Sequence, residues 1–342
     1  MPGTTTTAVD QFDVVATYSN LLREDPDLTM PVAAIESLVL ALAHNPTSTI
    51  TETLEYLKSL TDLLIASTPN PISLSAGTDL FQRYLIASLR PGVGGVAGDF
   101  QAVRQHLLSI GKQFAENAKA ARDQIAAYGT HFIRDGSTVL TTGGSRVVGA
   151  LLNEASEARG GSVRFKVIYV LPSSSAGQGK SVEGEGIVQN LRHKGVPVAT
   201  IPEGAVGYAM GKVDMVIVGA EGVVENGGVI SRLGTYQLAM LAKVTTKPFY
   251  VVAEAHKFVR LFPLGQYDLP IDQKIIDFKN EQDAQKDIEG GAEGYFAKTI
   301  NGSNGVSDAV DFTPPEYISG IITESGVLTP SAVSEELIKL WF

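Results

Sequence analysis

The sequence contains no cysteine, no polybasic run and no apolar run of membrane-spanning length. The absence of cysteine excludes disulfides, thiolate metal sites and cysteine nucleophiles, and it is typical of a reducing compartment. The five histidines show no spacing typical of metal ligands, so no metal site is predicted. A formal net charge of −10 disfavours direct binding to nucleic acid or to an anionic membrane.

Targeting signals are also lacking. A membrane-spanning helix needs about 18 or more consecutive apolar residues, and the first residues lack the basic-then-apolar layout of a signal peptide. We therefore expect a soluble protein of the cytosol. What is present suffices for a folded core, because 44% of the 342 residues are apolar and only 19% are charged. This length suits one large domain or two ordinary ones.

The two parts of the chain differ in hydrophobic pattern. Residues 1–130 repeat apolar positions at intervals of three and four and show no strand signal, which predicts a helical amino-terminal domain. Residues 131–342 alternate short β-branched runs with helical segments. This alternation predicts an α/β fold, a Rossmann-like doubly wound parallel sheet with helices on both faces. The expected strands are 137–142, 163–171, 196–201, 213–218, 248–253 and 320–323, and the expected helices are 147–159, 182–194, 208–212 and 233–243.

A polar, glycine-rich stretch interrupts this domain at about 268–311. Its composition predicts a long surface insertion without a packed core of its own.

The stretch 213–243 has the layout of a ligand site, with a buried strand, a polar loop and then a helix. Ligands of open parallel sheets bind at the carboxyl ends of the strands. Glu221 directly follows the strand, and Ser231 and Arg232 precede the helix. Glu221 is interpreted either as a pocket carboxylate or as a solvated loop residue. Arg232 is either a phosphate partner or a surface charge.

Two further loops follow predicted strands. The residues Thr142–Gly143–Gly144–Ser145–Arg146 offer backbone N–H groups and a cation to an anion, or simply form a tight turn with Ser145 as helix cap. Residues 174–181 depart from the phosphate-binding pattern G-x-x-x-x-G-K-[ST] because Ser174 replaces its first glycine. A flexible loop is the favoured interpretation there, and a nucleotide hydrolase that uses Lys180 is a further alternative.

Several long segments resemble a known family. Residues 24–38, 73–85, 213–243, 247–264 and 326–341 are similar to the alpha subunit of initiation factor 2B, the guanine-nucleotide exchange factor for eukaryotic initiation factor 2. The resemblance spans nearly the whole chain except the insertion. It implies a helical domain followed by a Rossmann-like domain, and a regulatory subunit without catalysis of its own.

The resemblance also implies partners. A homodimer would bridge two copies of the beta, gamma, delta and epsilon subunits into a decamer, in which the epsilon subunit carries the exchange activity. The alpha subunit would help to sense the phosphorylated alpha subunit of initiation factor 2 and so control translation initiation under stress. By motif position, the sensing residues would be Thr49, Ile50, Glu52 and Trp341.

The same family is similar to aldose–ketose isomerases that act on methylthioribose 1-phosphate and ribose 1,5-bisphosphate. Those enzymes carry a cysteine and an aspartate where this chain has Gly143 and Glu221, and an Asn–Lys pair where it has Ser231 and Arg232. Glycine cannot relay the proton that isomerisation requires. We therefore expect no required cofactor, but a remaining pocket for a sugar phosphate or nucleoside monophosphate, lined by Thr142, Gly143, Gly144, Ser145, Arg146, Glu221, Ser231 and Arg232. A phosphosugar isomerase is the alternative.

Overall fold

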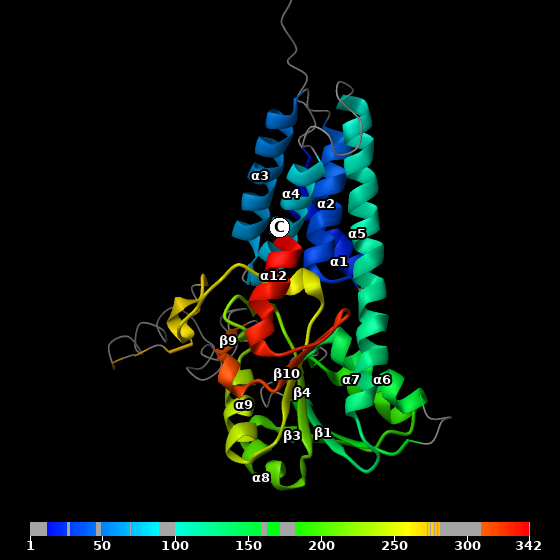
Figure 1. Cartoon of the computed structure of the whole chain (residues 1–342), viewed down its shortest axis with the longest axis vertical. Coiled ribbons are helices and arrows are strands. Elements are labelled where there is room, and N and C mark those ends of the chain that lie inside the picture. The colour runs from blue at the N-terminus through cyan, green and yellow to red at the C-terminus, as the bar shows by residue number, and fades with distance from the viewer. Residues whose placement is uncertain are drawn as a thin grey trace, which may run out of the picture. The chain divides into compact units, whose positions relative to one another are not determined.

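The chain divides into two compact units, Met1–Ala118 and Lys119–Phe342. The computed structural model (Figure 1) describes residues 12–25, 28–45, 49–68, 70–88, 100–158, 163–171, 182–271, 309–341 and the single positions 273, 275, 276, 278 and 280. The long helix α5 (Phe100–Gly129) runs through the boundary between the units and ends one residue before the domain boundary predicted at 130. None of the described helices is long and apolar enough to cross a membrane.

The first unit is built from helices around one apolar core. Helix α2 is nearly apolar all round, which is the pattern of a central, buried helix. Its residues Ile35 and Leu38 are fully buried, together with Leu57 and Leu64 of α3. Beside α5, the helices of this unit are α1 (Val14–Glu24), α2 (Met30–His44), α3 (Ile50–Ser67) and α4 (Ile72–Ser88).

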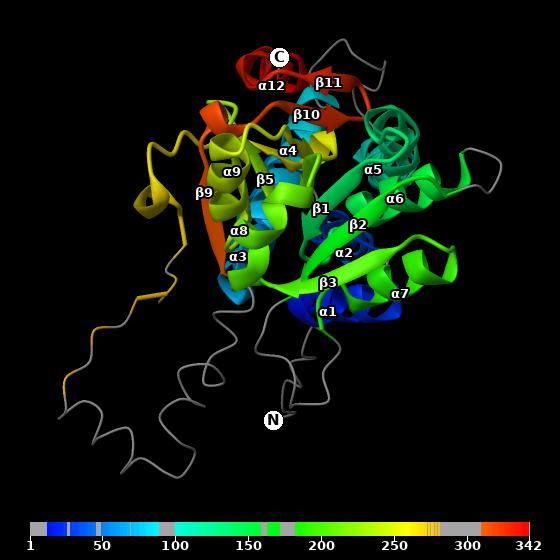
Figure 2. The ribbon, with the colours of Figure 1, turned by 90° about the horizontal axis from the view of Figure 1, so that it is seen from below.

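The second unit contains the predicted doubly wound sheet. Seven strands lie in the order β11-β10-β7-β4-β1-β2-β3, and all neighbours are parallel except β10 and β11. Figure 2 shows β1, β2 and β3 side by side. The strands are β1 (Thr138–Thr142), β2 (Lys166–Leu171), β3 (Val198–Pro202), β4 (Met215–Gly219), β7 (Phe249–Val252), β10 (Gly320–Thr323) and β11 (Gly326–Leu328).

Helices cover both faces of this sheet, and each face packs against its helices through its own apolar cluster. One cluster joins the sheet to the end of α5, α6 and α7, and the other joins it to α8, α9 and α12. This is the two-sided burial that the alternating pattern predicts. The helices are α6 (Arg146–Glu157), α7 (Glu185–His193), α8 (Val206–Ala209), α9 (Thr235–Val244) and α12 (Val333–Trp341), and the short 3₁₀ turns are η1 (Thr130–Phe132), η3 (Glu203–Ala205), η4 (Met210–Lys212), η5 (Ala255–Lys257), η6 (Gln266–Asp268), η7 (Pro315–Tyr317) and η8 (Pro330–Ala332).

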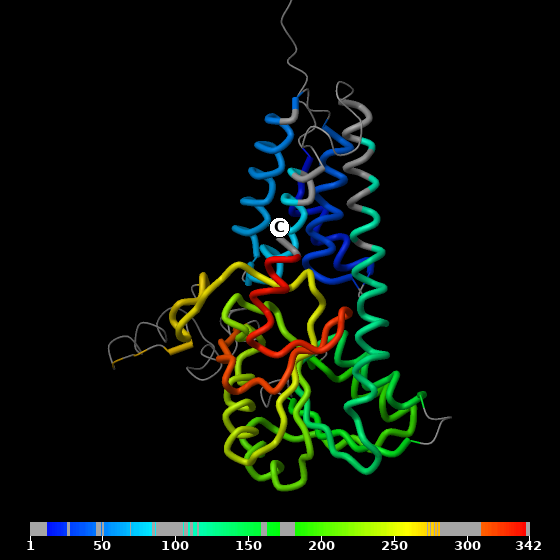
Figure 3. The backbone as a smooth tube through the Cα atoms, in the orientation of Figure 1, coloured from blue at the N-terminus to red at the C-terminus, as the bar shows by residue number. Residues whose placement is uncertain are grey.

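A second, four-stranded sheet corrects the sequence interpretation of residues 222–232 as a loop. Its order is β8-β5-β6-β9, and it consists of β5 (Gly222–Val224), β6 (Val229–Arg232), β8 (Phe258–Val259) and β9 (Val310–Thr313). Strand β9 also shows that the predicted insertion extended two residues too far, because 310 and 311 pair with β6. The rest of that insertion lies largely outside the described residues. Figure 3 shows the described backbone in colour.

Candidate functional site

The predicted pocket residues meet where the order of the main sheet reverses. From β1 the chain continues to β2 and β3 on one side, whereas β4, β7 and β10 lie on the other side. The carboxyl ends of the neighbouring strands β1 and β4 are Thr142 and Gly219. Crevices at such a reversal are the usual ligand sites of doubly wound folds. Glu221 follows β4 there, and Arg232 ends β6.

The turn after β1 is held by side chains of neighbouring strands. Gly143 has a φ of +75°, and the Tyr169 hydroxyl on β2 donates a hydrogen bond to its carbonyl. Burial raises the pKa of the Tyr169 hydroxyl, and the nearby charge of Glu183 raises it further, so this donor keeps its proton. The Thr142 hydroxyl is half-buried and donates to the Val170 carbonyl at 3.3 Å.

Helix α6 begins directly after this turn. The Ser145 side chain caps it by accepting from the Val148 N–H at 3.5 Å, as the cap interpretation of Ser145 predicts. Arg146 is the first helical residue and its side chain is exposed. The turn and the cap therefore connect β1 directly to α6 at the carboxyl edge of the sheet.

The loop after β4 brings a carboxylate next to a guanidinium. Glu221 is half-buried, and its Oε1 lies 4.0 Å from Nε of Arg232. The hydroxyl of Ser231 is buried and donates to the Gly219 carbonyl at 2.8 Å. Ser231 therefore joins the two sheets, whereas Glu221 and Arg232 lie at the carboxyl edge of the main sheet, where doubly wound folds form their ligand crevice.

Glu183 is a residue of this site that sequence reasoning missed. Its Oε1 accepts from Nε of Arg232 at 3.2 Å and from the Gly144 N–H at 3.0 Å. Glu183 precedes α7, and Gly184 behind it has a φ of +87°. The only sequence signal was an acidic residue in the segment after the second predicted strand. Residues 174–181, which carry the near match to a phosphate-binding loop and include Lys180, lie outside the described residues.

A second group of charges lies further along the same edge, after β7 and β10. Nζ of Lys257 lies 3.3 Å from Oε2 of the fully buried Glu254 and donates to the Ala220 carbonyl at 2.9 Å. Burial disfavours ionisation of Glu254, but Lys257 and His256 outweigh it and hold the pKa of this carboxyl at about 2. Both carboxylate oxygens of Glu324 accept from the Ala255 N–H at 3.1 Å. These charges therefore connect loops.

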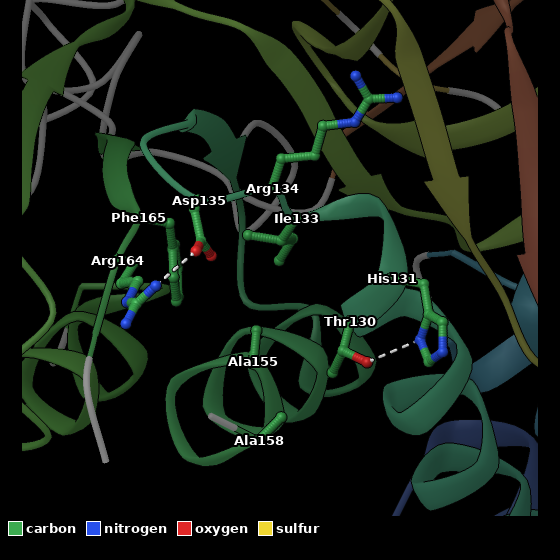
Figure 4. A pocket seen from close by; sticks show the side chains of 9 residues that line it. All are labelled: Thr130, His131, Ile133, Arg134, Asp135, Ala155, Ala158, Arg164 and Phe165. Carbon is green, nitrogen blue, oxygen red and sulfur yellow. Dashed lines mark hydrogen bonds and ion pairs between the residues drawn. The ribbon is translucent and has the colours of Figure 1, made fainter. Parts of the chain in front are cut away.

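The amino edge of the sheet carries a cavity of about 370 Å³ that none of the predicted site residues lines (Figure 4). Ile133 and Phe165 contribute buried apolar side chains to it. An ion pair at 3.0 Å between Arg164 and Asp135 lies on one side, and Thr130 hydrogen-bonds to His131 on the other. Within the described residues, no group of His, Asp and Glu is arranged to hold a metal ion.

The residues assigned to partner binding lie on two helices of different units. Thr49 is the N-cap of α3 and accepts from the Glu52 N–H at 3.2 Å, and the Glu52 side chain is exposed. Ile50 is the first residue of α3, and Trp341 is the last residue of α12. The side chains of Ile50 and Trp341 lie outside the described part, so their roles stay predictions.

Comparison with known proteins identifies a family and close relatives. The model of the "Initiation factor 2 subunit family" matches residues 23–330. The chain is 34% identical over 336 residues to translation initiation factor eIF2B subunit alpha of Dictyostelium discoideum, covering 96% of both chains. The subunit of the same name from Caenorhabditis elegans is 29% identical, covering 97% of this chain and 99% of that one.

More distant relatives include enzymes. Ribose 1,5-bisphosphate isomerase of Pyrococcus furiosus is 27% identical over 327 residues, covering 95% of this chain and 92% of the isomerase. Among solved structures, a chain of the tetrameric eIF2B-beta2-delta2 complex from C. thermophilum superposes with a TM-score of 0.69 at 19% identity, over 99% of this chain and 100% of that one. This likeness confirms the predicted fold class.

Proposed function

Because the chain belongs to the initiation factor 2 subunit family, we propose that it is a non-catalytic regulatory subunit of the cytosolic guanine-nucleotide exchange factor for initiation factor 2. The observation that carries this proposal is the 34% identity to an eIF2B alpha subunit over 96% of both chains. The isomerase of Pyrococcus furiosus also matches over both units, so the higher identity to the eIF2B alpha subunit, and not the coverage, favours the regulatory role.

The local chemistry of the crevice supports a non-catalytic role. An aldose–ketose isomerase must move a proton between adjacent carbons, which requires a positioned acid and base. Position 143 has no side chain, and its carbonyl already accepts the Tyr169 hydroxyl. Glu221 lies beside Arg232, with 4.0 Å between its Oε1 and the Nε of the guanidinium. A carboxylate can accept hydrogen bonds from sugar hydroxyl groups, and a guanidinium can donate hydrogen bonds to phosphate oxygens.

We propose a sugar phosphate or a nucleoside monophosphate as the ligand of this crevice, with no cofactor required. The support is the position at the sheet reversal together with the guanidinium of Arg232 and the Gly144 N–H. Thr142, Gly143, Ser145 and Arg146 would complete the wall on the β1 side. Such a ligand would stabilise the folded or assembled protein only through its preference for that form.

The partner surfaces are part of the same proposal. The chain would form a homodimer and bind the beta, gamma, delta and epsilon subunits. The exposed start of α3 around Thr49 and Glu52 and the end of α12 at Trp341 would contribute to sensing the phosphorylated alpha subunit of initiation factor 2. Exposure of Glu52 is compatible with this role.

Affinity purification of the tagged chain from its own cells tests the proposal. We expect four further exchange-factor subunits in equal amounts, together with initiation factor 2. A bare homodimer without these proteins would contradict the regulatory role. In cells, Trp341→Ala should weaken the inhibition of translation by the phosphorylated factor while the complex still assembles. Normal inhibition in that strain would remove Trp341 from the sensing surface.

The isomerase relatives supply one alternative that is directly testable. Purified protein is incubated with ribose 1,5-bisphosphate, and the ketose product is quantified. We expect no turnover. Turnover that Glu221→Gln abolishes would establish an enzyme on this scaffold and overturn the non-catalytic proposal.

A further inference from the structure

The carboxylate of Glu183 lies in the turn after β1. Oε1 of Glu183 accepts hydrogen bonds from the Gly144 N–H and from Nε of Arg232, at 3.0 Å and 3.2 Å. The contact is close along the whole side chain, because a Cβ atom on Gly144 would lie 2.7 Å from Cγ of Glu183. The side chain of Glu183 is thus seated in the turn.

The two donors that Glu183 uses are those that a phosphate group would need. Backbone N–H groups beside a helix start and an arginine side chain are the common partners of phosphate oxygens. A carboxylate oxygen that accepts from both occupies the position of a phosphate oxygen. Binding of a phosphate at this position therefore requires Glu183 to leave it.

The charges around Arg232 also oppose the binding of a phosphate while Glu183 stays in place. Two carboxylates, Glu183 and Glu221, lie within 4.0 Å of Nε of the single guanidinium of Arg232. A phosphate dianion placed beside Arg232 would meet the like charges of both carboxylates, and like charges brought together at a binding site oppose binding strongly. Because about two fifths of the Glu183 side chain is exposed (39%), it can rotate into water without disturbing the core.

We propose that Glu183 is a specificity-determining residue of the crevice, an internal carboxylate that competes with phosphate groups for Gly144 and Arg232. The inference rests on the ligand crevice advanced under the proposed function. Its consequence is that the wild-type chain binds phosphate monoesters weakly, and that the identity of residue 183 sets this affinity.

Titration of purified full-length chain with ribose 5-phosphate, followed by calorimetry, tests the proposal. Glu183→Gln keeps the shape of the side chain and removes its charge, and we expect roughly tenfold or tighter binding than wild type. Glu185→Gln is the matched control, because it removes the same charge two residues away, where the carboxylate contacts Val182 and Gln189 instead. Its affinity should stay within about twofold of wild type.

Two further arms make the result decisive. Ribose without phosphate should bind Glu183→Gln and wild type alike, since only the phosphate competes with Glu183. Adding Arg232→Gln to Glu183→Gln should remove the gain, because it removes one of the two donors. Weaker, unchanged or absent binding of ribose 5-phosphate by Glu183→Gln would overturn the proposal, and so would a gain that survives the loss of Arg232. Thermal unfolding verifies that each variant is folded, and copurification of the exchange-factor subunits tests the regulatory role separately.

Discussion

The carboxyl edge of the main sheet carries two neighbouring groups of charges that differ in burial. The open cluster consists of Glu183, Glu221 and Arg232, whose side chains are 39%, 20% and 29% exposed. The buried cluster consists of Glu254, His256, Lys257 and Glu324, in which the Glu254 side chain is 1% exposed. The loop after β4 connects them, because Lys257 donates to the carbonyl of Ala220, next to Glu221.

This difference separates a ligand site from a structural network. Water screens the charges of the open cluster, so a ligand can replace one partner there at little loss of stability. Charges in the buried cluster have lost their hydration, and removal of one partner leaves the other uncompensated. Acidic and basic side chains at the same sheet edge therefore serve different purposes, which variants in each cluster can test.

The largest effect is expected from Lys257→Met in the buried cluster. Glu254 would lose its counter-ion and the Ala220 carbonyl its donor, so we expect the free energy of unfolding to fall by about 3–5 kcal/mol. Urea unfolding at pH 7 measures the change. Lys194→Met is the control, because its ion pair with Glu157 lies at the surface and should contribute at most about 1 kcal/mol. A similar small loss for both variants would contradict the comparison.

The next largest effect is expected from Gly184→Ala beside the open cluster. Gly184 has a φ of +87°, and an added Cβ would lie 2.6 Å from the Tyr169 ring and 2.9 Å from the Gly143 carbonyl oxygen. We expect a loss of about 2–3 kcal/mol in urea unfolding. Gly186→Ala, whose Cβ would meet nothing within 4 Å, should instead be neutral or stabilising by up to about 1 kcal/mol. Equal effects would show that a side chain at position 184 meets neither backbone strain nor the contacts with Tyr169 and Gly143.

Two buried groups, Asp311 near the open cluster and His256 in the buried cluster, should make the stability depend on pH in opposite directions. Asp311 of β9 pairs with Ser231 and accepts from the Gly234 and Tyr236 N–H groups at the start of α9. Burial raises the pKa of its carboxyl from 3.8 to about 7, although those N–H groups oppose the shift. Between these values the native state holds a proton that the unfolded state has lost, so this group makes stability fall as pH rises.

Asp311→Asn should therefore gain stability relative to wild type as pH rises from about 4 to 7, on the order of 2 kcal/mol across the window.

His256 changes the stability with pH in the opposite direction. Burial lowers its pKa from 6.5 to about 4, so its contribution is present above pH 6.5 and is lost on acidification through pH 4. His256→Gln should lose stability relative to wild type over the same rise in pH. Urea unfolding at four pH values measures both slopes, and parallel slopes would refute these assignments.

The smallest effect is expected from Arg232→Gln in the open cluster. Its ion pairs with Glu183 and Glu221 are partly solvated, so unfolding should change by about 1 kcal/mol or less at low salt and by less still in 1 M salt. A loss as large as that of Lys257→Met would make Arg232 a structural residue. It would also weaken the case for a ligand crevice.

Much of the main sheet could be predicted from the sequence because its signal is local. The expected strands 137–142, 213–218 and 248–253 overlap β1, β4 and β7, whose buried residues follow one another along the chain. The second sheet could not be predicted in this way. Its strands have two to four residues, and β6 pairs with β9 across the long polar segment. Short apolar pairs beside glycines have the same pattern as a turn.

The sequence by itself determined the order of the helices and of most strands of the main sheet, the lack of any thiol, and the glycine at position 143 that denies the crevice a proton-relaying side chain. Those properties depend on residue identity and local periodicity alone. Only the tertiary structure decided that Arg232 meets Glu183, 49 residues away, and that Lys257 neutralises a buried Glu254 rather than a ligand. Which charges become neighbours depends on strand order and burial, because crossovers bring distant loops to one sheet edge and packing then sets the access of water.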